Sequence, residues 1–305
     1  VAGLPAMQPL DAAGVAAADP ALAGRFAQGL LLPGEGQIDN RQLFAALAQD
    51  MQQLGVAVHY DSPRELGDFR PGEAGQSDWL IDCRGLGARQ QWQALRGVRG
   101  EVVRIHAPEV TLARPTRLVH PRYSIYVAPK ENHVFVIGAT EIESDDRSGM
   151  SVRSALELLS AAYTIHIGFA EARILELSTQ CRPTLPDNLP AIRMPRPRVL
   201  QINGMYRHGF MQAPALHDVA LQWLNQGQSP LAAQFDLAQL GMLERIPCYI
   251  TLAAEHVIAP FQQLEVIGKG MFAVPVDELV FLDPGLALRT PNLHRPAVDA
   301  QMVVH

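Results

Sequence analysis

The sequence predicts an α/β (α+β) protein, in which an α/β segment with a glycine turn is followed by an antiparallel sheet. A helix, two strands and a glycine pair follow one another between residues 39 and 87. From Gly100 to Thr140, short apolar segments alternate with turn-forming residues, which is typical of antiparallel strands. A further strand, glycine turn and helix start follow from Val199. These three patterns together define the fold class.

The first elements follow from apolar spacing. Residues 26–32 predict a short strand, and residues 39–54 predict a helix because their apolar side chains recur at intervals of three and four. Gly55 ends that helix, and residues 56–60 and 79–83 predict two strands. The glycines after the second strand would let the backbone approach a ligand, although a glycine pair of this kind is more often an ordinary turn.

The second half of the pattern is mainly β. Strands are predicted at residues 101–106, 117–120, 123–128 and 134–140, with residues 130–133 as a hairpin turn. A helix is expected over residues 152–162, starting from Ser148 or Ser151. Residues 199–203 predict a strand that leads through a glycine turn into an apolar helix. A helix start of this kind can receive an anionic or electron-rich group.

Composition excludes several classes of protein. A net charge of -6, with no dense run of Lys and Arg, argues against a nucleic-acid partner. Three cysteines without ligand spacing indicate neither a disulfide framework nor a metal site, and favour a reducing cytoplasm. No apolar run reaches the roughly 18 residues of a membrane span. We therefore expect no nucleic acid, no membrane and no metal.

Two arginines indicate a site for a small carboxylate. Arg182 lies in a proline-punctuated apolar stretch, and Arg207 lies in a glycine-flanked segment that enters a helix. A guanidinium holds a carboxylate through two parallel hydrogen bonds, and such a partner offsets the cost of its burial. The alternatives are that Arg182 satisfies loop carbonyls and that Arg207 lies at a solvated helix start.

Four ordered motifs resemble a known family. They are Ser124-Ile125-Tyr126-Val127-Ala128-Pro129, Val136-Ile137-Gly138-Ala139-Thr140-Glu141, Cys181-Arg182-Pro183-Thr184 and the segment from Gly204 to Pro214. Together they resemble the FAD-dependent D-amino acid oxidase family, and within it the bacterial glycine oxidases of thiamine biosynthesis. The resemblance runs from about residue 1 to about residue 240.

The resemblance implies roles for individual residues. Arg182 matches the arginine that binds the substrate carboxylate, and Tyr126 matches a strand tyrosine that faces the substrate. Arg207 matches a second arginine of the pocket, and the resemblance places all three in the catalytic site. Glu141 and Ser124 match positions that line it.

The resemblance also implies FAD as the cofactor. Gly85 and Gly87 match the turn beside the flavin, and Arg64 matches a contact near the adenine. The remaining cofactor-binding positions form one segment that wraps the flavin: Gly204, Met205, Tyr206, Arg207, His208, Gly209, Phe210 and Met211.

The chain departs from the family pattern at both ends. The GxGxxG loop that holds the pyrophosphate of FAD occurs nowhere in the 305 residues. We therefore expect an N-terminally truncated chain, with a partial Rossmann-like FAD-binding domain that lacks its first βαβ unit and an antiparallel substrate domain of the D-amino acid oxidase type. The expected domains are residues 1–28 (lead segment of the substrate domain), 29–94 (partial FAD-binding domain), 95–180 (substrate domain), 181–240 (C-terminal part of the FAD-binding domain) and 241–305 (unmatched extension).

The implied function is that of an enzyme. It is FAD-dependent oxidative deamination of glycine or another small amino acid, such as sarcosine or a D-amino acid, to a 2-oxo acid, ammonia and hydrogen peroxide, in the service of thiamine biosynthesis. The partners are then the amino acid and oxygen, and relatives of this kind are often homo-oligomers. The alternative is a non-catalytic or cofactor-deficient fragment, because the GxGxxG loop is absent.

Overall fold

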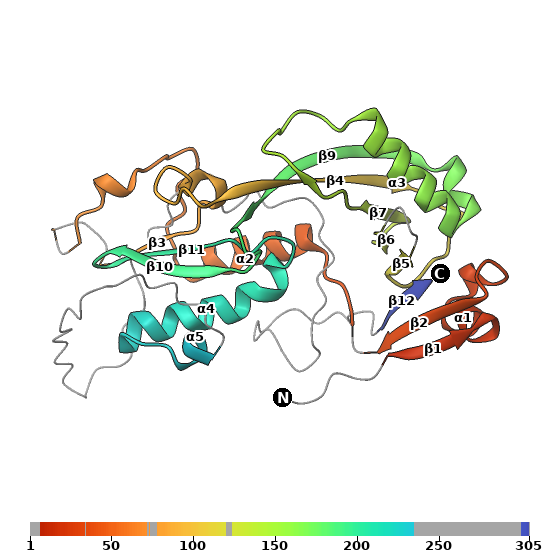
Figure 1. Ribbon diagram of the computed structural model, residues 1–305, viewed down its shortest axis with the longest axis horizontal. Coiled ribbons are helices and arrows are strands. Elements are labelled where there is room, and N and C mark those ends of the chain that lie inside the picture. The colour runs from red at the N-terminus through yellow and green to blue at the C-terminus, as the bar shows by residue number, and fades with distance from the viewer. Residues whose placement is uncertain are drawn as a thin grey trace. The chain divides into compact units, whose positions relative to one another are not determined.

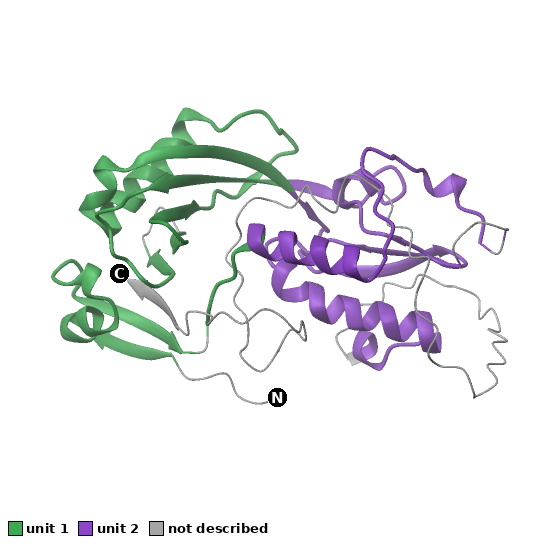
Figure 2. Cartoon of the chain, turned by 180° about the vertical axis from the view of Figure 1, so that it is seen from behind, with its two compact units in different colours: residues 1–40, 98–181, 275–305 green, residues 41–97, 182–274 purple. Residues whose placement is uncertain are grey.

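A computed structural model gives the structure of the chain and describes residues 7–33, 35–71, 73, 78–119, 124–234 and 300–304 (Figure 1). The chain divides into two compact units (Figure 2). Unit 1 comprises residues 1–40, 98–181 and 275–305, and unit 2 comprises residues 41–97 and 182–274. Most of the expected extension, residues 241–299 and 305, lies outside the described residues.

A large, mainly antiparallel sheet forms unit 1. Its strands lie in the order β1 (Gln8–Asp11), β2 (Gln28–Pro33), β12 (Ala300–Val304), β5 (Thr116–Val119), β6 (Ser124–Pro129), β7 (Val134–Gly138), β4 (Arg96–His106) and β8 (Ile142–Glu143). A further strand, β9 (Arg173–Thr184), pairs with β4. The short strands predicted between residues 101 and 140 are therefore neighbours in one sheet, as an antiparallel reading requires.

Helix α3 (Val152–Ile165) covers this sheet and closes the core of unit 1. Ser151 caps the helix by accepting a hydrogen bond from the Ser154 N–H over 3.1 Å. Its buried face presents Leu158, Ala161, Ala162 and Ile165 to the sheet residues. The core also includes Val15 of α1 (Ala12–Ala18), Leu22 of η1 (Pro20–Leu22) and Phe169 of η4 (Ile167–Glu171).

Unit 2 is built on a small sheet in the order β10 (Ala191–Arg196), β11 (Val199–Asn203) and β3 (Leu80–Asp82). β11 runs parallel to β3 and antiparallel to β10. The long helix α4 (Gly209–Gln226) packs Leu216, Val219 and Ala220 against apolar residues of this sheet. The unit also contains α2 (Asn40–Gln53), η2 (Leu66–Asp68), η3 (Gly85–Ala88) and α5 (Pro230–Gln234).

The strand predicted at residues 56–60 is wrong, because the structure has irregular chain there. Gly55 ends α2 with a φ of +72°, and Val58 and Tyr60 on the following segment are both exposed. Alternating apolar residues form a strand only where a neighbouring strand satisfies the backbone, and none of the described strands pairs with this segment. No helix in the described part of the chain is long and apolar enough to cross a membrane.

We expect Leu158→Ala to destabilise the protein by about 2 to 5 kcal/mol, because it leaves a cavity in the core of unit 1. Leu156→Ala on the same helix is the matched control, since Leu156 is 61% exposed and its truncation should cost less than about 0.5 kcal/mol. Urea unfolding followed by circular dichroism measures both. Equal effects of the two substitutions would contradict the packing of α3.

Candidate functional site

The side chain of Asn203 joins the ends of the two parallel strands of unit 2. Asn203 is the last residue of β11 and is buried. Its Nδ2 donates to the carbonyl of Gly85 over 2.9 Å, and its Oδ1 accepts from the Gly204 N–H over 2.9 Å. Because the carboxyl ends of parallel strands meet at one edge of a sheet, this amide ties together the loops that leave β3 and β11. Ligands of α/β folds bind at such edges.

Both loops need glycine at the position that bonds to the Asn203 side chain, which is Gly85 in one loop and Gly204 in the other. Gly85 has a φ of +57° and Gly204 a φ of +80°. A β-carbon on Gly204 would lie 2.7 Å from Leu185 Cδ1 and 3.1 Å from the carbonyl oxygen of Leu189. A β-carbon on Gly85 would lie 3.4 Å from Pro183 Cγ. Glycine therefore lets both loops approach the segment that follows Arg182.

Arg182 is buried in β9, with 4% of its surface exposed. The next residue, Pro183, accepts a hydrogen bond from the Tyr206 N–H over 3.2 Å. Unit 2 thus brings together three segments that the sequence singled out: the one with Arg182, the turn at Gly85, and the loop from Gly204 to Tyr206. Burial of the Arg182 guanidinium requires hydrogen-bonding partners and favours an anionic one.

The loop after β11 leads directly into the start of α4. Tyr206 has a φ of 50°, and the His208 N–H donates to the Met205 carbonyl over 3.0 Å. His208 is the N-cap of α4 but makes no side-chain capping bond, so the N–H groups of the first turn, from Gly209 onward, are not capped by that residue. The positive end of a helix of 18 residues attracts anionic or electron-rich groups.

The other predicted positions of unit 2 lie at its surface. Arg207, His208 and Met211 are exposed, whereas Met205, Tyr206, Gly209 and Phe210 are half-buried. Phe210 packs against Phe44 of α2, with ring centroids 5.6 Å apart. Gly87 is exposed in η3, and Arg64 is exposed in the irregular chain before η2.

Three of the residues predicted to line the substrate site belong to unit 1. Tyr126 lies on β6 opposite Gly138 of β7, and a β-carbon on Gly138 would lie 2.6 Å from the Tyr126 hydroxyl oxygen and 2.8 Å from Val102 Cγ1. The missing side chain at residue 138 therefore makes room for the tyrosine ring. Ser124 begins the same strand, two residues before Tyr126, and Glu141 is exposed between β7 and β8.

A ring of polar groups, of which Asp82 and Gln201 are buried, supports the strand ends of unit 2. Asp82 accepts from Arg84 Nε over 2.8 Å and from Gln201 Nε2 over 2.7 Å. Gln201 Oε1 in turn accepts from Arg193 Nε over 2.7 Å. Gln91 closes the ring, because its carbonyl accepts from Arg193 and its Oε1 accepts from Arg84 Nη2 over 3.2 Å. Burial opposes the charge of Asp82, but the hydrogen bonds from Arg84 and Gln201 outweigh it and lower its pKa.

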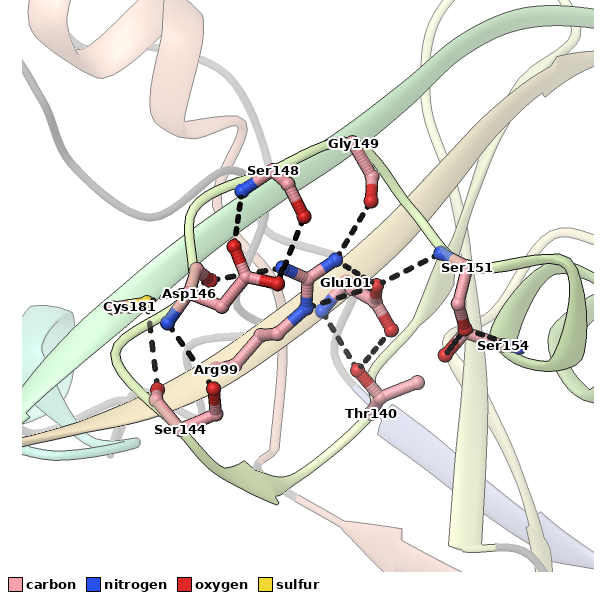
Figure 3. A network of polar contacts seen from close by, with 10 residues as sticks. All are labelled: Arg99, Glu101, Thr140, Ser144, Asp146, Ser148, Gly149, Ser151, Ser154 and Cys181. Carbon is pink, nitrogen blue, oxygen red and sulfur yellow. Dashed lines mark hydrogen bonds and ion pairs between the residues drawn. The ribbon is translucent and has the colours of Figure 1, made fainter.

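A second buried network lies in unit 1 and was not predicted (Figure 3). Arg99 donates from Nη2 to Glu101 Oε1 over 2.6 Å, to the Gly149 carbonyl over 2.8 Å, and from Nη1 to the Asp146 carbonyl over 2.8 Å. Thr140 Oγ1 donates to Glu101 Oε2 over 3.1 Å. The pair therefore fixes the chain that follows Glu141. Residues two apart share one face of a strand, but the strand predicted from the sequence began at Glu101 and did not include Arg99, so the pair was missed.

Comparisons with known proteins agree with the fold. A sequence profile of the FAD dependent oxidoreductase family matches residues 1–221. The chain belongs to this family of FAD-dependent oxidoreductases. FAD is accordingly the cofactor of the family, and the resemblance first seen in four motifs is confirmed.

Relatives of the chain include a protein of Rhizobium etli that is named as a putative thiamine biosynthesis oxidoreductase, ThiO. It is 41% identical over 72% of this chain and 65% of its own length. A glycine oxidase of Geobacillus kaustophilus is 26% identical over 75% of this chain and 63% of its own length. The crystal structure of a glycine oxidase from that organism aligns with a TM-score of 0.65 at 23% identity, covering 79% of this chain and 68% of the other. The chain thus spans slightly less than two thirds of these two sequence relatives.

The residues of unit 2 fit one part of FAD. The close backbone approach at Gly204 and the start of α4 suit a flat, electron-rich ring system. Gln212, in the first turn of α4, has a buried Oε1 with no hydrogen-bond partner among the described residues, so an acceptor remains for a donor group of a ligand. The GxGxxG loop that would hold the pyrophosphate is not among the 305 residues.

We expect Gly138→Ala to destabilise the protein by about 1 to 3 kcal/mol, because the new methyl group collides with Tyr126 and Val102. Gly149→Ala is the control in the same unit, since an added β-carbon there meets nothing within 4 Å. Urea unfolding compares the two variants. A loss of stability in Gly149→Ala as large as that in Gly138→Ala would contradict the placement of the tyrosine.

The Arg99–Glu101 pair gives stability a defined pH dependence. Burial opposes the charge of Glu101, but hydrogen bonds from Ser154, Arg99, Ser151 and Thr140 outweigh it and lower its pKa. The resulting stabilisation is present above the usual glutamate pKa of about 4.3 and is lost as the pH falls through the lowered pKa.

We expect Glu101→Gln to cost about 3 to 5 kcal/mol near neutral pH, because Arg99 is left as a buried charge without its carboxylate. The difference from the wild-type protein should shrink as the pH falls below about 4. Urea unfolding at a series of pH values measures it, with Glu157→Gln as the surface control. A difference in stability that stays constant with pH would contradict the buried ion pair between Arg99 and Glu101.

Proposed function

We propose that this chain contributes the substrate-binding part of an FAD-dependent oxidase that deaminates glycine or another small amino acid. Membership of the FAD-dependent oxidoreductase family supports the reaction class. The single observation that carries the substrate class is the burial of Arg182 beside the glycine-lined strand ends of unit 2. A buried guanidinium favours a carboxylate, which every amino acid substrate provides.

In this proposal Arg182 binds the substrate carboxylate and sets the orientation of the α-carbon. The substrate loses two electrons and two protons to become an imine, which water hydrolyses to a 2-oxo acid and ammonia. FAD, when bound, supplies the two-electron acceptor, and oxygen is finally reduced to hydrogen peroxide. Tyr126 and Arg207 are proposed as further substrate-binding residues, and Ser124 and Glu141 as residues that adjust selectivity.

The cofactor residues proposed are the glycine turn at Gly85 and Gly87, the segment from Gly204 to Met211, and Arg64. The segment from Gly204 to Met211 would contact the flavin, because glycine at residue 204 lets the backbone approach a ligand closely and the segment leads into the start of α4. Glycine is the favoured substrate and sarcosine the next. The name of the relative from Rhizobium etli supports a role in thiamine biosynthesis, and that of the relative from Geobacillus kaustophilus supports glycine as the substrate. The cysteine pattern supports the cytoplasm.

Binding of the cofactor is the first test. The purified chain is scanned for visible flavin absorbance, before and after incubation with FAD and removal of the excess. Retained flavin bands are expected. A chain that stays colourless in both cases would favour the alternative, a cofactor-deficient fragment, and would leave the carboxylate site to be tested by substrate binding alone.

We expect Arg182→Ala to raise the KM for glycine about ten- to 150-fold, because a charged hydrogen bond contributes about 1.5 to 3 kcal/mol. Arg182→Lys should recover only part of this loss, since lysine cannot form the two parallel bonds. Release of hydrogen peroxide measures KM and kcat for glycine, sarcosine and D-alanine, with methylamine as a substrate analogue that lacks the carboxylate.

The control for this series is Arg198→Ala, which removes a half-exposed arginine of the same unit and should leave KM unchanged. The wild-type protein should prefer glycine to methylamine strongly, and Arg182→Ala should lose most of that preference. An unaltered preference in a folded, flavin-containing Arg182→Ala variant would exclude the carboxylate role.

A further inference from the structure

The last described strand, β12, lies inside the unit 1 sheet between β2 and β5 (Figure 1). It runs antiparallel to β2, with Met302 opposite Leu31, and parallel to β5, with Met302 opposite Thr116. Residues 120–299 separate it from β5, which is its nearer neighbour in the sequence. Its place in the sheet therefore depends on backbone pairing with two distant strands, and not on a turn.

β12 links two parts of this sheet. In the strand order, β1 and β2 lie on one side of it, and β5 and the strands beyond β5 lie on the other. Neighbouring strands lie about 5 Å apart, so the edges of β2 and β5 face each other across about 10 Å, the width that one strand fills. Each edge offers backbone N–H and C=O groups for pairing. We call the space between these two edges the β2–β5 slot.

The two walls of the β2–β5 slot are joined by contacts that do not involve β12. Asp19 is buried, and its Oδ2 accepts from the N–H groups of Ala113 and Arg114 over 2.9 and 3.2 Å. Arg114 Nε donates to the carbonyl of Ala18 over 3.0 Å. Because Asp19 lies between β1 and β2 and Arg114 leads into β5, these bonds hold the walls together independently of β12.

The residues along the walls favour an apolar ligand. Leu30, Leu31 and Leu32 of β2 are half-buried, and Leu118 of β5 is buried in the core of unit 1. Side chains of adjacent strands on one face of a sheet pack against each other, so apolar residues of an incoming strand would pack beside these leucines. The ligand chemistry of the slot is therefore that of an extended, mainly apolar peptide with both backbone edges free.

We propose that the β2–β5 slot is a peptide-binding site that recognises a strand, and that β12 is the occupant supplied by the same chain. Because backbone pairing places β12, a separate peptide of the same sequence can satisfy the same groups, as in other cases of recognition by strand addition. The proposal does not depend on the oxidase function.

Fluorescence anisotropy with a labelled peptide of residues 299–305 tests the proposal on the full chain. Met302→Pro removes one N–H from the ladders of β12 and should weaken its hold on the slot. We expect this variant to bind the peptide about tenfold or more tightly than the wild-type chain, whose own strand competes at a high local concentration.

A matched peptide and a second variant make the result specific. The same peptide with Met302→Pro cannot donate at that position and should bind about tenfold or more weakly. Met302→Gly in the chain weakens β12 but keeps its N–H, so its affinity for the peptide should lie between those of the wild-type and Met302→Pro chains. Circular dichroism establishes that each variant is folded.

Amide hydrogen exchange locates the binding. In the Met302→Pro chain the amides of β2 and β5 should exchange faster than in the wild-type chain, and added peptide should slow them again. The amides of β10 and β11 in unit 2 should not respond. Folded variants that do not bind the peptide, equal affinity for the two peptides, or protection away from β2 and β5 would each overturn the proposal.

Discussion

The arrangement of unit 2 depends on the side-chain amide of Asn203. It donates to the loop after β3 and accepts from the loop after β11, so two chain segments more than a hundred residues apart are fixed to each other at one sheet edge. Glycine is then required at residue 204 by the close approach to Leu185, and at residue 85 by its positive φ. The same loop also positions the segment that contains Arg182, because the Tyr206 N–H donates a hydrogen bond to the carbonyl of Pro183.

In both units a buried carboxylate paired with an arginine fixes the chain segments around it. Asp82 in unit 2 and Glu101 in unit 1 are each held by an arginine two residues away on the chain and by further hydrogen bonds from distant segments. Such pairs add little net stability, because burial of charge costs about as much as the attraction returns. Their effect is to make alternative loop arrangements costly, since any rearrangement leaves a buried charge without partners.

Regular elements were predictable where side-chain periodicity decided them, as in α2, α3 and β11. The strand predicted at residues 56–60 is not formed, because an alternating apolar pattern alone does not supply a partner strand. The glycines and arginines of the candidate site carried a sequence signal, since their backbone freedom and fixed charge are properties of the residue itself. Asn203, Gly138 and the Arg99–Glu101 pair carried almost none, because their roles arise from residues that are distant in the chain.

The loop from Gly204 to Tyr206 is organised by contacts within unit 2. The Gly204 N–H donates to Asn203 Oδ1 and the Tyr206 N–H donates to the Pro183 carbonyl, which holds the segment from Gly204 to Tyr206. The His208 N–H donates to the Met205 carbonyl where the chain enters α4. All of these partners belong to unit 2. A loop that is already ordered does not lose conformational freedom when a ligand binds, so its contribution to affinity is largely retained. The contacts with Asn203 and Pro183 therefore order this loop before any ligand binds, so a ligand at these strand ends would meet a preformed backbone surface.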